Sequence, residues 1–174
     1  MRANSLAHAD TLYSADCIEF CPFPGYENIF VCGTYQVLEP PSASVRDEKE
    51  GADDEDESGD DAEGSLRPRH TMRTGRLLLY RVGDDEASIQ EVQRVDTPAI
   101  LDAKWSPRLD DHSCPVLAVA DADGHITLYT LNVEKYQLEL QQSVQVGDPS
   151  TLCLSLDYHQ FAPFVSSSCT QLDH

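Results

Sequence analysis

The sequence is short of basic residues, of tryptophan and of long apolar runs. It has 12 lysines and arginines against 31 aspartates and glutamates, which gives a net charge of −19 over 174 residues. Nucleic-acid phosphates are bound by clustered lysine and arginine, so this balance argues against nucleic acid as a partner. The longest apolar runs, Val116–Ala120 and Leu77–Tyr80, fall far below the roughly 18 residues of a membrane helix. No membrane partner is therefore expected.

Secretory signals and common catalytic motifs are also missing. Residues 1–13 lack the apolar core of a signal peptide, so we expect a chain of the cytosol or nucleus, with the cytoplasm as its location. The sequence contains no G-x-S-x-G elbow, Walker loop, G-x-G-x-x-G fingerprint or H-E-x-x-H pair. Motifs therefore assign no catalytic residue, and no cofactor is expected.

The six cysteines include no C-x-x-C pair. Four of them stand in apolar, strand-like stretches, which favours small buried side chains in a reducing compartment. A zinc site is the alternative, but its ligand spacing is missing, so no metal is expected. The four are Cys17, Cys21, Cys32 and Cys153, and the other two are Cys114 and Cys169.

The chain does contain an internal repeat, found by comparing it with itself. Three segments run to an aromatic residue through alternating apolar and polar or small positions: SADCIEF to Phe20, AILDAKW to Trp105, and TLCLSLDY to Tyr158. In each segment the second residue before the aromatic is apolar. This alternation is typical of a half-buried strand.

Three more strand-like elements follow each of the first two segments in the same order. The third elements align without a gap, and Gly75 matches Gly124 at what we interpret as a tight turn. The fourth elements are more polar, as exposed outer strands are. Four antiparallel strands per unit is the anatomy of a β-propeller blade. The matched elements are 28–34 with 115–121, 74–82 with 123–131, and Ile89–Val95 with Leu138–Val146.

These units predict an all-β protein, a WD40-type β-propeller that is incomplete, with two blades and part of a third. The Trp-Asp dipeptide typical of such repeats is absent, so the prediction depends on register and order. Propellers normally need at least about four blades, so we interpret the chain as a fragment, a truncated product or a splice product. Partner chains that complete the ring are the alternative. The predicted parts are a flexible N-terminus at 1–11 and a partial propeller at 12–174, with blade one at 12–96, blade two at 97–147 and partial blade three at 148–174.

An acidic insert at 39–72 interrupts blade one. Its central run, 47–63, holds 11 acidic residues and one lysine, and Pro40 and Pro41 precede it. Such a composition cannot supply a core, which predicts a disordered loop. We favour a solvated spacer, and a docking segment for a basic partner is the alternative.

Four charged residues lie on or next to the innermost predicted strands: Asp16, Glu19, Asp102 and Lys104. Innermost strands line the channel of a propeller, so these are candidates for facing a ligand there. The favoured interpretation is that they are ordinary polar positions of alternating strands. His125, next to a turn glycine, is predicted to be an exposed turn residue.

Five strings in order, DCIEFCP, VCGTYQ, GRLLLY, EVQRVDTPAILDAKW and LAVADADG, resemble the WD-repeat family of diphthine methyl ester hydrolases in diphthamide biosynthesis. The resemblance covers residues 10–38 and 73–158. It implies hydrolysis of the methyl ester of methylated diphthine on translation elongation factor 2, the implied protein partner. Because most blades are missing, the isolated chain is expected to lack esterase activity. The alternative is a non-enzymatic WD-repeat scaffold for protein–protein interaction.

Overall fold

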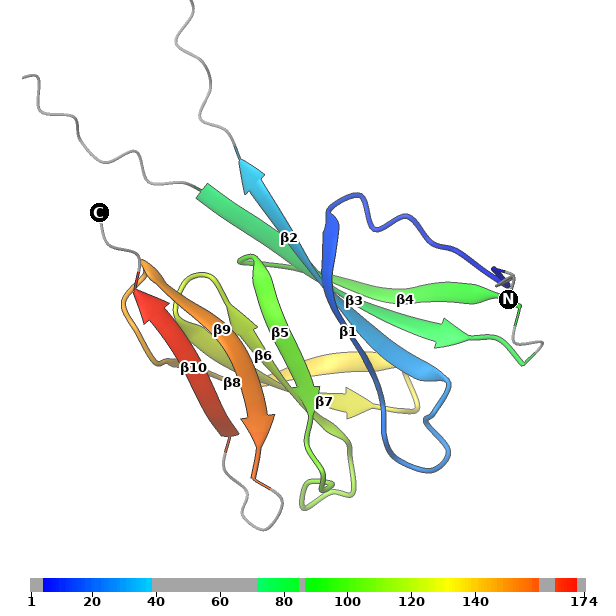
Figure 1. Ribbon diagram of the computed structural model, residues 1–174. Coiled ribbons are helices and arrows are strands. Elements are labelled where there is room, and N and C mark those ends of the chain that lie inside the picture. Colours follow the sequence, from blue (N-terminus) through cyan, green and yellow to red (C-terminus); the bar gives the residue numbers. More distant parts are fainter. Residues whose placement is uncertain (1–4, 39–71, 85–86, 160–164, 172–174) are drawn as a thin grey trace, which may run out of the picture.

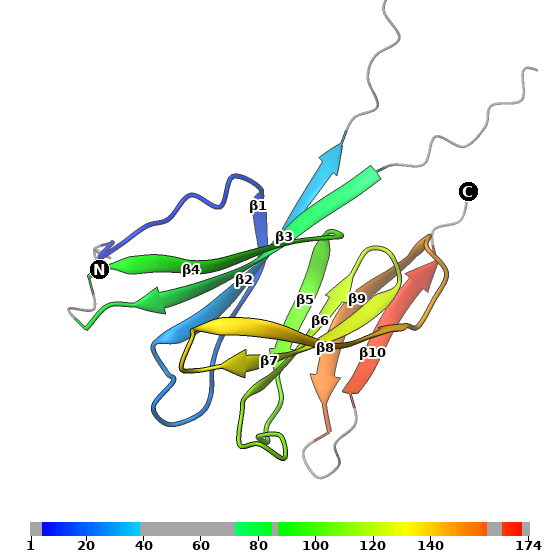
Figure 2. The same ribbon diagram turned by 180° about the vertical axis from the view of Figure 1, so that it is seen from behind.

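The computed structural model describes residues 5–38, 72–84, 87–159 and 165–171. Every regular element in these ranges is a β-strand, and none of them contains a helix that could span a membrane (Figures 1 and 2). The strands form three antiparallel sheets, each connected in chain order. The sheets comprise β1 (Ser14–Phe20), β2 (Ile29–Leu38), β3 (Met72–Val82) and β4 (Ile89–Thr97); β5 (Ile100–Trp105), β6 (Val116–Asp121), β7 (His125–Asn132) and β8 (Gln137–Gln145); and β9 (Thr151–Tyr158) with β10 (Val165–Gln171).

The all-β class and the order of the predicted strands are confirmed. Each four-strand unit found by self-comparison forms one sheet, and Phe20, Trp105 and Tyr158 end the first strands of their sheets. The acidic insert predicted at 39–72 lies outside the described residues except for Met72, which begins β3. The predicted flexible N-terminus is described only from Ser5 onward.

A β-bulge stands at the same position in the first strand of all three sheets. Its extra residue is the fourth before the terminal aromatic: Asp16 in β1, Leu101 in β5 and Leu154 in β9. The pairings of β3 with β4 and of β7 with β8 also share an irregularity at matching positions. A bulge bends its strand and redirects the neighbouring side chains. The repeat is therefore one of backbone geometry as well as of side-chain pattern.

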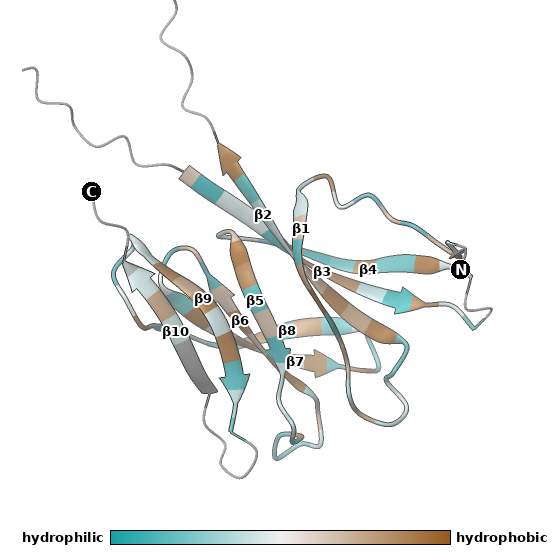
Figure 3. Cartoon of the chain, in the orientation of Figure 1, coloured by the Kyte–Doolittle hydropathy of each residue, from teal (hydrophilic) through white to brown (hydrophobic). Residues whose placement is uncertain are grey.

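The first and second sheets pack through one shared hydrophobic core. Figure 3 shows the apolar stretches of β3 and β5 that contribute to it. Two polar side chains also join these sheets. The indole Nε1 of Trp105 donates to the Glu19 carbonyl at 3.2 Å, and the Gln93 amide donates to the Leu138 carbonyl at 3.1 Å while accepting from the Leu138 N–H at 2.6 Å. The fully buried side chains of this core include Ile29, Val31, Leu77, Leu79, Ile100, Ala103, Leu117 and Leu131.

The second and third sheets share a smaller apolar cluster. Ala118 and Ala120 of β6 are small, which lets β9 approach closely, and Ile126, Cys153 and Leu156 complete the contact. Burial of these apolar groups fixes β9 against the second sheet.

The two aligned glycines have different roles, which corrects the interpretation of both as turn residues. Gly124 does occupy the turn between β6 and β7, with φ of 78°. Gly75 instead lies inside β3, where a Cβ would stand 2.3 Å from the Thr34 carbonyl oxygen. The aligned residues thus share a place in the sequence pattern but meet different constraints.

The outer face of the first sheet carries an exposed aromatic group. Phe20 is 54% exposed and its ring lies 4.9 Å from that of Phe30, which stacks on Tyr80 at 5.1 Å. Phe20 and Leu6 border a groove of about 540 Å³. Because side chains alternate along β1, this apolar groove and the charged Glu19 lie on opposite faces of the strand.

Candidate functional site

The first strands of the three sheets are neighbours, with β5 between β1 and β9 (Figure 1). This arrangement brings together all four candidates from the sequence: Asp16 and Glu19 from β1, and Asp102 and Lys104 from β5. Asp16 is the extra residue of the bulge in β1, and Asp102 directly follows the extra residue of the bulge in β5. We call these four residues the first-strand cluster.

Lys104 is the centre of the first-strand cluster. Its Nζ forms an ion pair with Glu19 Oε1 of the first sheet and lies 3.7 Å from Asp102 Oδ1 of its own strand. The hydrogen bond that Lys104 donates to Glu19 is the main cause of the raised pKa of Lys104, and the charges of Asp102 and Glu19 act in the same direction. Lys104 is therefore a fixed cation that donates hydrogen bonds, rather than a neutral amine that acts as a base.

Asp102 connects the second sheet to the third. Its Oδ2 accepts a hydrogen bond from the backbone N–H of Leu156 at 2.8 Å, and its Oδ1 accepts one from the N–H of Ala103 at 2.9 Å. One carboxylate thus satisfies a backbone donor of β9 while it faces Lys104. The sequence pattern predicted the position of Asp102 but not this link between sheets.

Asp16 and Cys17 lie beside these charges. Partial burial, followed by the charge of Asp102, raises the pKa of Asp16. Burial raises the pKa of Cys17 to about 12, and the charges of Asp102 and Asp16 add to that effect against a hydrogen bond at the Gly33 backbone. Cys17 is a thiol at neutral pH, so it lacks the thiolate that a nucleophilic cysteine needs.

The first-strand cluster combines three carboxyl groups with one ammonium group. Carboxylates accept protons from water, and a fixed cation stabilises a developing oxyanion. Among the residues that the structure describes, no group of three or more His, Cys, Asp or Glu side chains could hold a metal ion. The three carboxyl groups and the ammonium group themselves offer acid–base and electrostatic chemistry.

Outside the first-strand cluster, the carboxylate of Asp121 stabilises the turn between β6 and β7. It is buried, and its Oδ1 accepts the N–H groups of Asp123 at 3.0 Å and His125 at 2.9 Å. The prediction that His125 is an exposed turn residue is partly wrong. His125 is the first residue of β7, its side chain is only 33% exposed, and its Nδ1 lies 3.8 Å from Asp121 Oδ1. The motif Asp-Ala-Asp-Gly after an apolar strand is the local sequence signal for this turn.

Replacing Asp121 by asparagine is expected to raise the free energy of unfolding at neutral pH by up to about 1 kcal/mol, since an amide accepts the same bonds without a buried charge. Burial is the largest influence on Asp121 and raises its pKa. A group with a raised folded-state pKa contributes its stability below the ordinary carboxyl range and loses it as the pH rises through the raised value. The advantage of asparagine should therefore shrink as the pH falls.

Urea unfolding at neutral and acidic pH measures this difference. Asp121→Ala is the matched control, and it should lose about 1–2 kcal/mol because two backbone donors lose their acceptor. Equal stability of the aspartate and alanine forms at neutral pH would contradict the assigned role in the turn.

The cysteines follow the sequence prediction in part. Cys21, Cys32 and Cys153 are buried, which confirms them as small core side chains, whereas Cys17 is half-buried. Cys153 and Cys169 have no paired spacing motif in the sequence, but the structure places their sulfur atoms side by side.

Repeated four-stranded antiparallel units, with a charged cluster on their adjoining first strands, define this chain as an all-β repeat protein. No protein-family model matches it. The chain is 33% identical over 158 residues to human diphthine methyltransferase. The aligned region covers 88% of this chain and 32% of the human protein. The mouse protein of that name is 31% identical, and the aligned region covers 88% of this chain and 29% of the mouse protein. The Schizosaccharomyces pombe protein of that name is 38% identical, and the aligned region covers 50% of this chain and 24% of the yeast protein.

This chain therefore belongs to the same family as the proteins named diphthine methyltransferase. It spans about a third of the length of the human and mouse relatives. The resemblance found in the sequence strings is thereby confirmed.

Proposed function

We propose that this chain is part of an enzyme of diphthamide biosynthesis, a diphthine methyl ester hydrolase that acts on translation elongation factor 2 in the cytoplasm. The observation that carries the proposal is the 33% identity to human diphthine methyltransferase over 88% of the chain. The relatives' name refers to methyl transfer. In the proposed reaction water attacks the ester carbonyl, the methyl group leaves as methanol, and a carboxylate remains.

We further propose that the three sheets are consecutive blades of a WD40-type β-propeller, with blade one at 12–96, blade two at 97–147 and blade three beginning at 148. Three observations support it: the repeated strand order, the aromatic end of each first strand and the shared bulge. In such a fold the adjoining strands β1, β5 and β9 are innermost. The first-strand cluster would then face the central channel.

The charges of the first-strand cluster suit ester hydrolysis. Lys104 is a fixed cation that can stabilise the oxyanion of the tetrahedral intermediate, and Glu19 is a carboxylate within reach of the same region. Asp102 holds Lys104 from the other side and fixes β9 through Leu156. We therefore propose that Lys104 takes part in the reaction, with Asp102 as its positioning residue.

Deleting the gene for this chain in its own organism tests the proposal. We expect elongation factor 2 to keep the methyl ester on its modified histidine and to lack the final amide, as measured by mass spectrometry of the modified peptide. Restoring the gene should restore the mature form. Fully amidated elongation factor in the deletion strain would overturn the proposal.

A restored gene with Lys104→Met separates enzyme from scaffold. We expect conversion to slow by at least about 100-fold, which is the usual effect of losing one oxyanion donor. Lys135→Met is the matched control, because Lys135 is an exposed lysine remote from the first strands, in the connection between β7 and β8. Normal conversion by Lys104→Met, at equal protein level, would favour the non-enzymatic scaffold.

A further inference from the structure

Two cysteines face each other on the third sheet. Cys153 of β9 and Cys169 of β10 are direct partners in the antiparallel register, and their Sγ atoms lie 3.1 Å apart. Directly opposed residues have Cβ atoms about 4.5–5.5 Å apart, and a disulfide needs a Cβ separation of about 3.5–4.5 Å. A shift of about 1 Å would therefore bring the two sulfur atoms to bonding distance.

The bulge in β9 creates this pairing. Ser168 faces Ser155, so an unbroken ladder would place Cys169 opposite Leu154. Because Leu154 is the extra residue of the bulge, Cys169 instead faces Cys153. A backbone feature shared by all three sheets thus brings two sulfur atoms together in the third.

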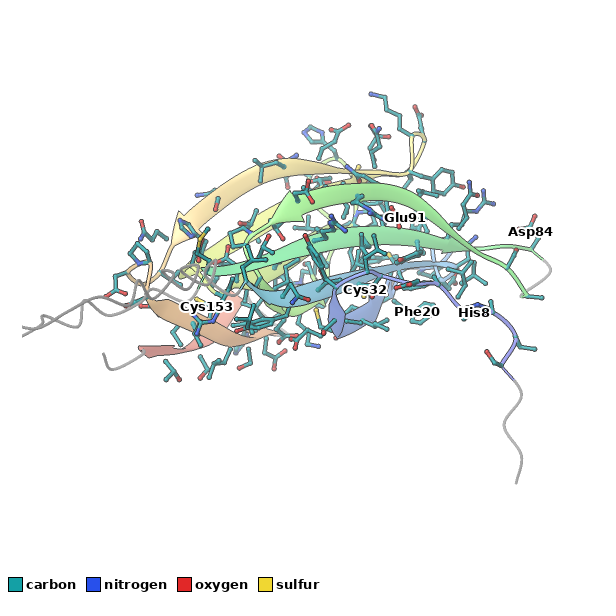
Figure 4. All side chains as sticks on the ribbon, turned by 90° about the horizontal axis from the view of Figure 1, so that it is seen from above. His8, Phe20, Cys32, Asp84, Glu91 and Cys153 are labelled. Carbon is teal, nitrogen blue, oxygen red and sulfur yellow. The ribbon has the colours of Figure 1, made fainter. Side chains whose placement is uncertain are left out.

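The two thiols differ in their access to solvent. Cys153 is fully buried in the cluster with Ala118, Ala120 and Leu156, and burial, with Cys169 beside it, raises the pKa of Cys153 to about 12. Cys169 is exposed. A soluble reagent therefore meets Cys169 first, and Cys153 is placed to react with whatever forms there. Figure 4 shows Cys153 at the end of the molecule away from Phe20 and Asp84.

We propose that Cys153 and Cys169 form a redox-modification site that is oxidised by a small disulfide such as glutathione disulfide. The Cys169 sulfur attacks one sulfur of the reagent and breaks its S–S bond. A mixed disulfide forms, and the released glutathione takes the proton from Cys169. Cys153 is also mostly a thiol at neutral pH, but the 3.1 Å contact holds its sulfur against the Cys169 sulfur, so this second step is intramolecular. The Cys153 sulfur attacks the Cys169 sulfur, the bond from Cys169 to glutathione breaks, and the second glutathione leaves with the proton from Cys153. Two protein thiols are oxidised to one disulfide, and one glutathione disulfide is reduced to two thiols.

The disulfide at this site is a reversible covalent link between β9 and β10. In a reducing compartment the pair stays as two thiols. When the oxidised fraction of the thiol pool rises, exchange forms the bond and β10 becomes covalently attached to β9. Asp102 of the first-strand cluster accepts a hydrogen bond from the Leu156 N–H of β9. The disulfide therefore links β10 to the strand that contacts this cluster.

Oxidation of the folded chain by glutathione disulfide, followed by alkylation and trypsin digestion, tests the proposal. No lysine or arginine follows Lys135, so trypsin leaves both cysteines on one peptide, 136–174, and Cys114 on another, 109–135. We expect peptide 136–174 to lose the mass of two hydrogen atoms and to take up no alkylating reagent. The bond should form about tenfold faster in the folded chain than in guanidinium, because folding holds the sulfur atoms together.

Two variants complete the test. Cys169→Ser replaces an exposed side chain, so it should fold normally, and its Cys153 should remain open to alkylation after unfolding. Cys114→Ser, a change outside the third sheet, should form the bond at the rate of the parent chain. A parent chain that stops at a stable mixed disulfide on Cys169, or that forms the bond no faster than in guanidinium, would overturn the proposal.

Discussion

A chain in which Gly75 is replaced by alanine is expected to lose about 3 kcal/mol or more of its free energy of unfolding. The added Cβ would lie 2.3 Å from the Thr34 carbonyl oxygen and 2.8 Å from both the Ala99 Cα and the Pro98 carbonyl oxygen. All three are backbone atoms, so no side-chain rotation relieves the overlap. To admit one methyl group, β3 must separate from β2 and from the segment that leads into β5.

Urea unfolding followed by far-ultraviolet circular dichroism measures this loss. Thr74→Ala, at the preceding residue of the same strand, is the matched control, because its side chain is only half-buried. It should change stability by less than about 1 kcal/mol. If Gly75→Ala were no more destabilising than Thr74→Ala, the close approach of the three backbones would be wrong.

Replacing Trp105 by alanine is expected to lower the free energy of unfolding by about 4 kcal/mol. The indole is only 7% exposed, belongs to the core between the first and second sheets, and donates to the Glu19 carbonyl. Trp105→Ala therefore leaves a large cavity where the two sheets meet. Circular dichroism must follow this unfolding, because Trp105 is the single tryptophan.

Trp105→Phe separates packing from hydrogen bonding. Phenylalanine keeps most of the apolar volume and loses only the indole donor, so it should cost about 1 kcal/mol for the bond, together with a smaller packing loss. Alanine and phenylalanine variants of equal stability would show that the volume of the ring does not hold the sheets together.

The strands were predictable because alternation of apolar and polar residues is a local signal. The three aromatic residues that end β1, β5 and β9 were found by spacing alone. The role of Gly75 was not predictable, because its constraint comes from Thr34 and Pro98, which are distant in sequence or on another segment. The bulges were also missed, since one extra residue in a short strand barely changes the pattern of alternation.

The candidate site was predictable in membership but not in pairing. Asp16, Glu19, Asp102 and Lys104 were found because first strands neighbour each other in repeated sheets. Their bonds between sheets join residues more than 50 positions apart, such as the bond from the Leu156 N–H to Asp102. No local pattern encodes such a partner, so only the packing of the sheets reveals it.

The shared bulge belongs to the repeated unit rather than to any one sheet. Asp16, Leu101 and Leu154 occupy one structural position although they differ in chemistry. Three separate insertions would have had to reach the same place, whereas duplication of a single ancestral unit that already carried the bulge yields all three copies at once. The three copies thus share a backbone frame, whereas the charged cluster and the cysteine pair depend on side chains that differ from copy to copy.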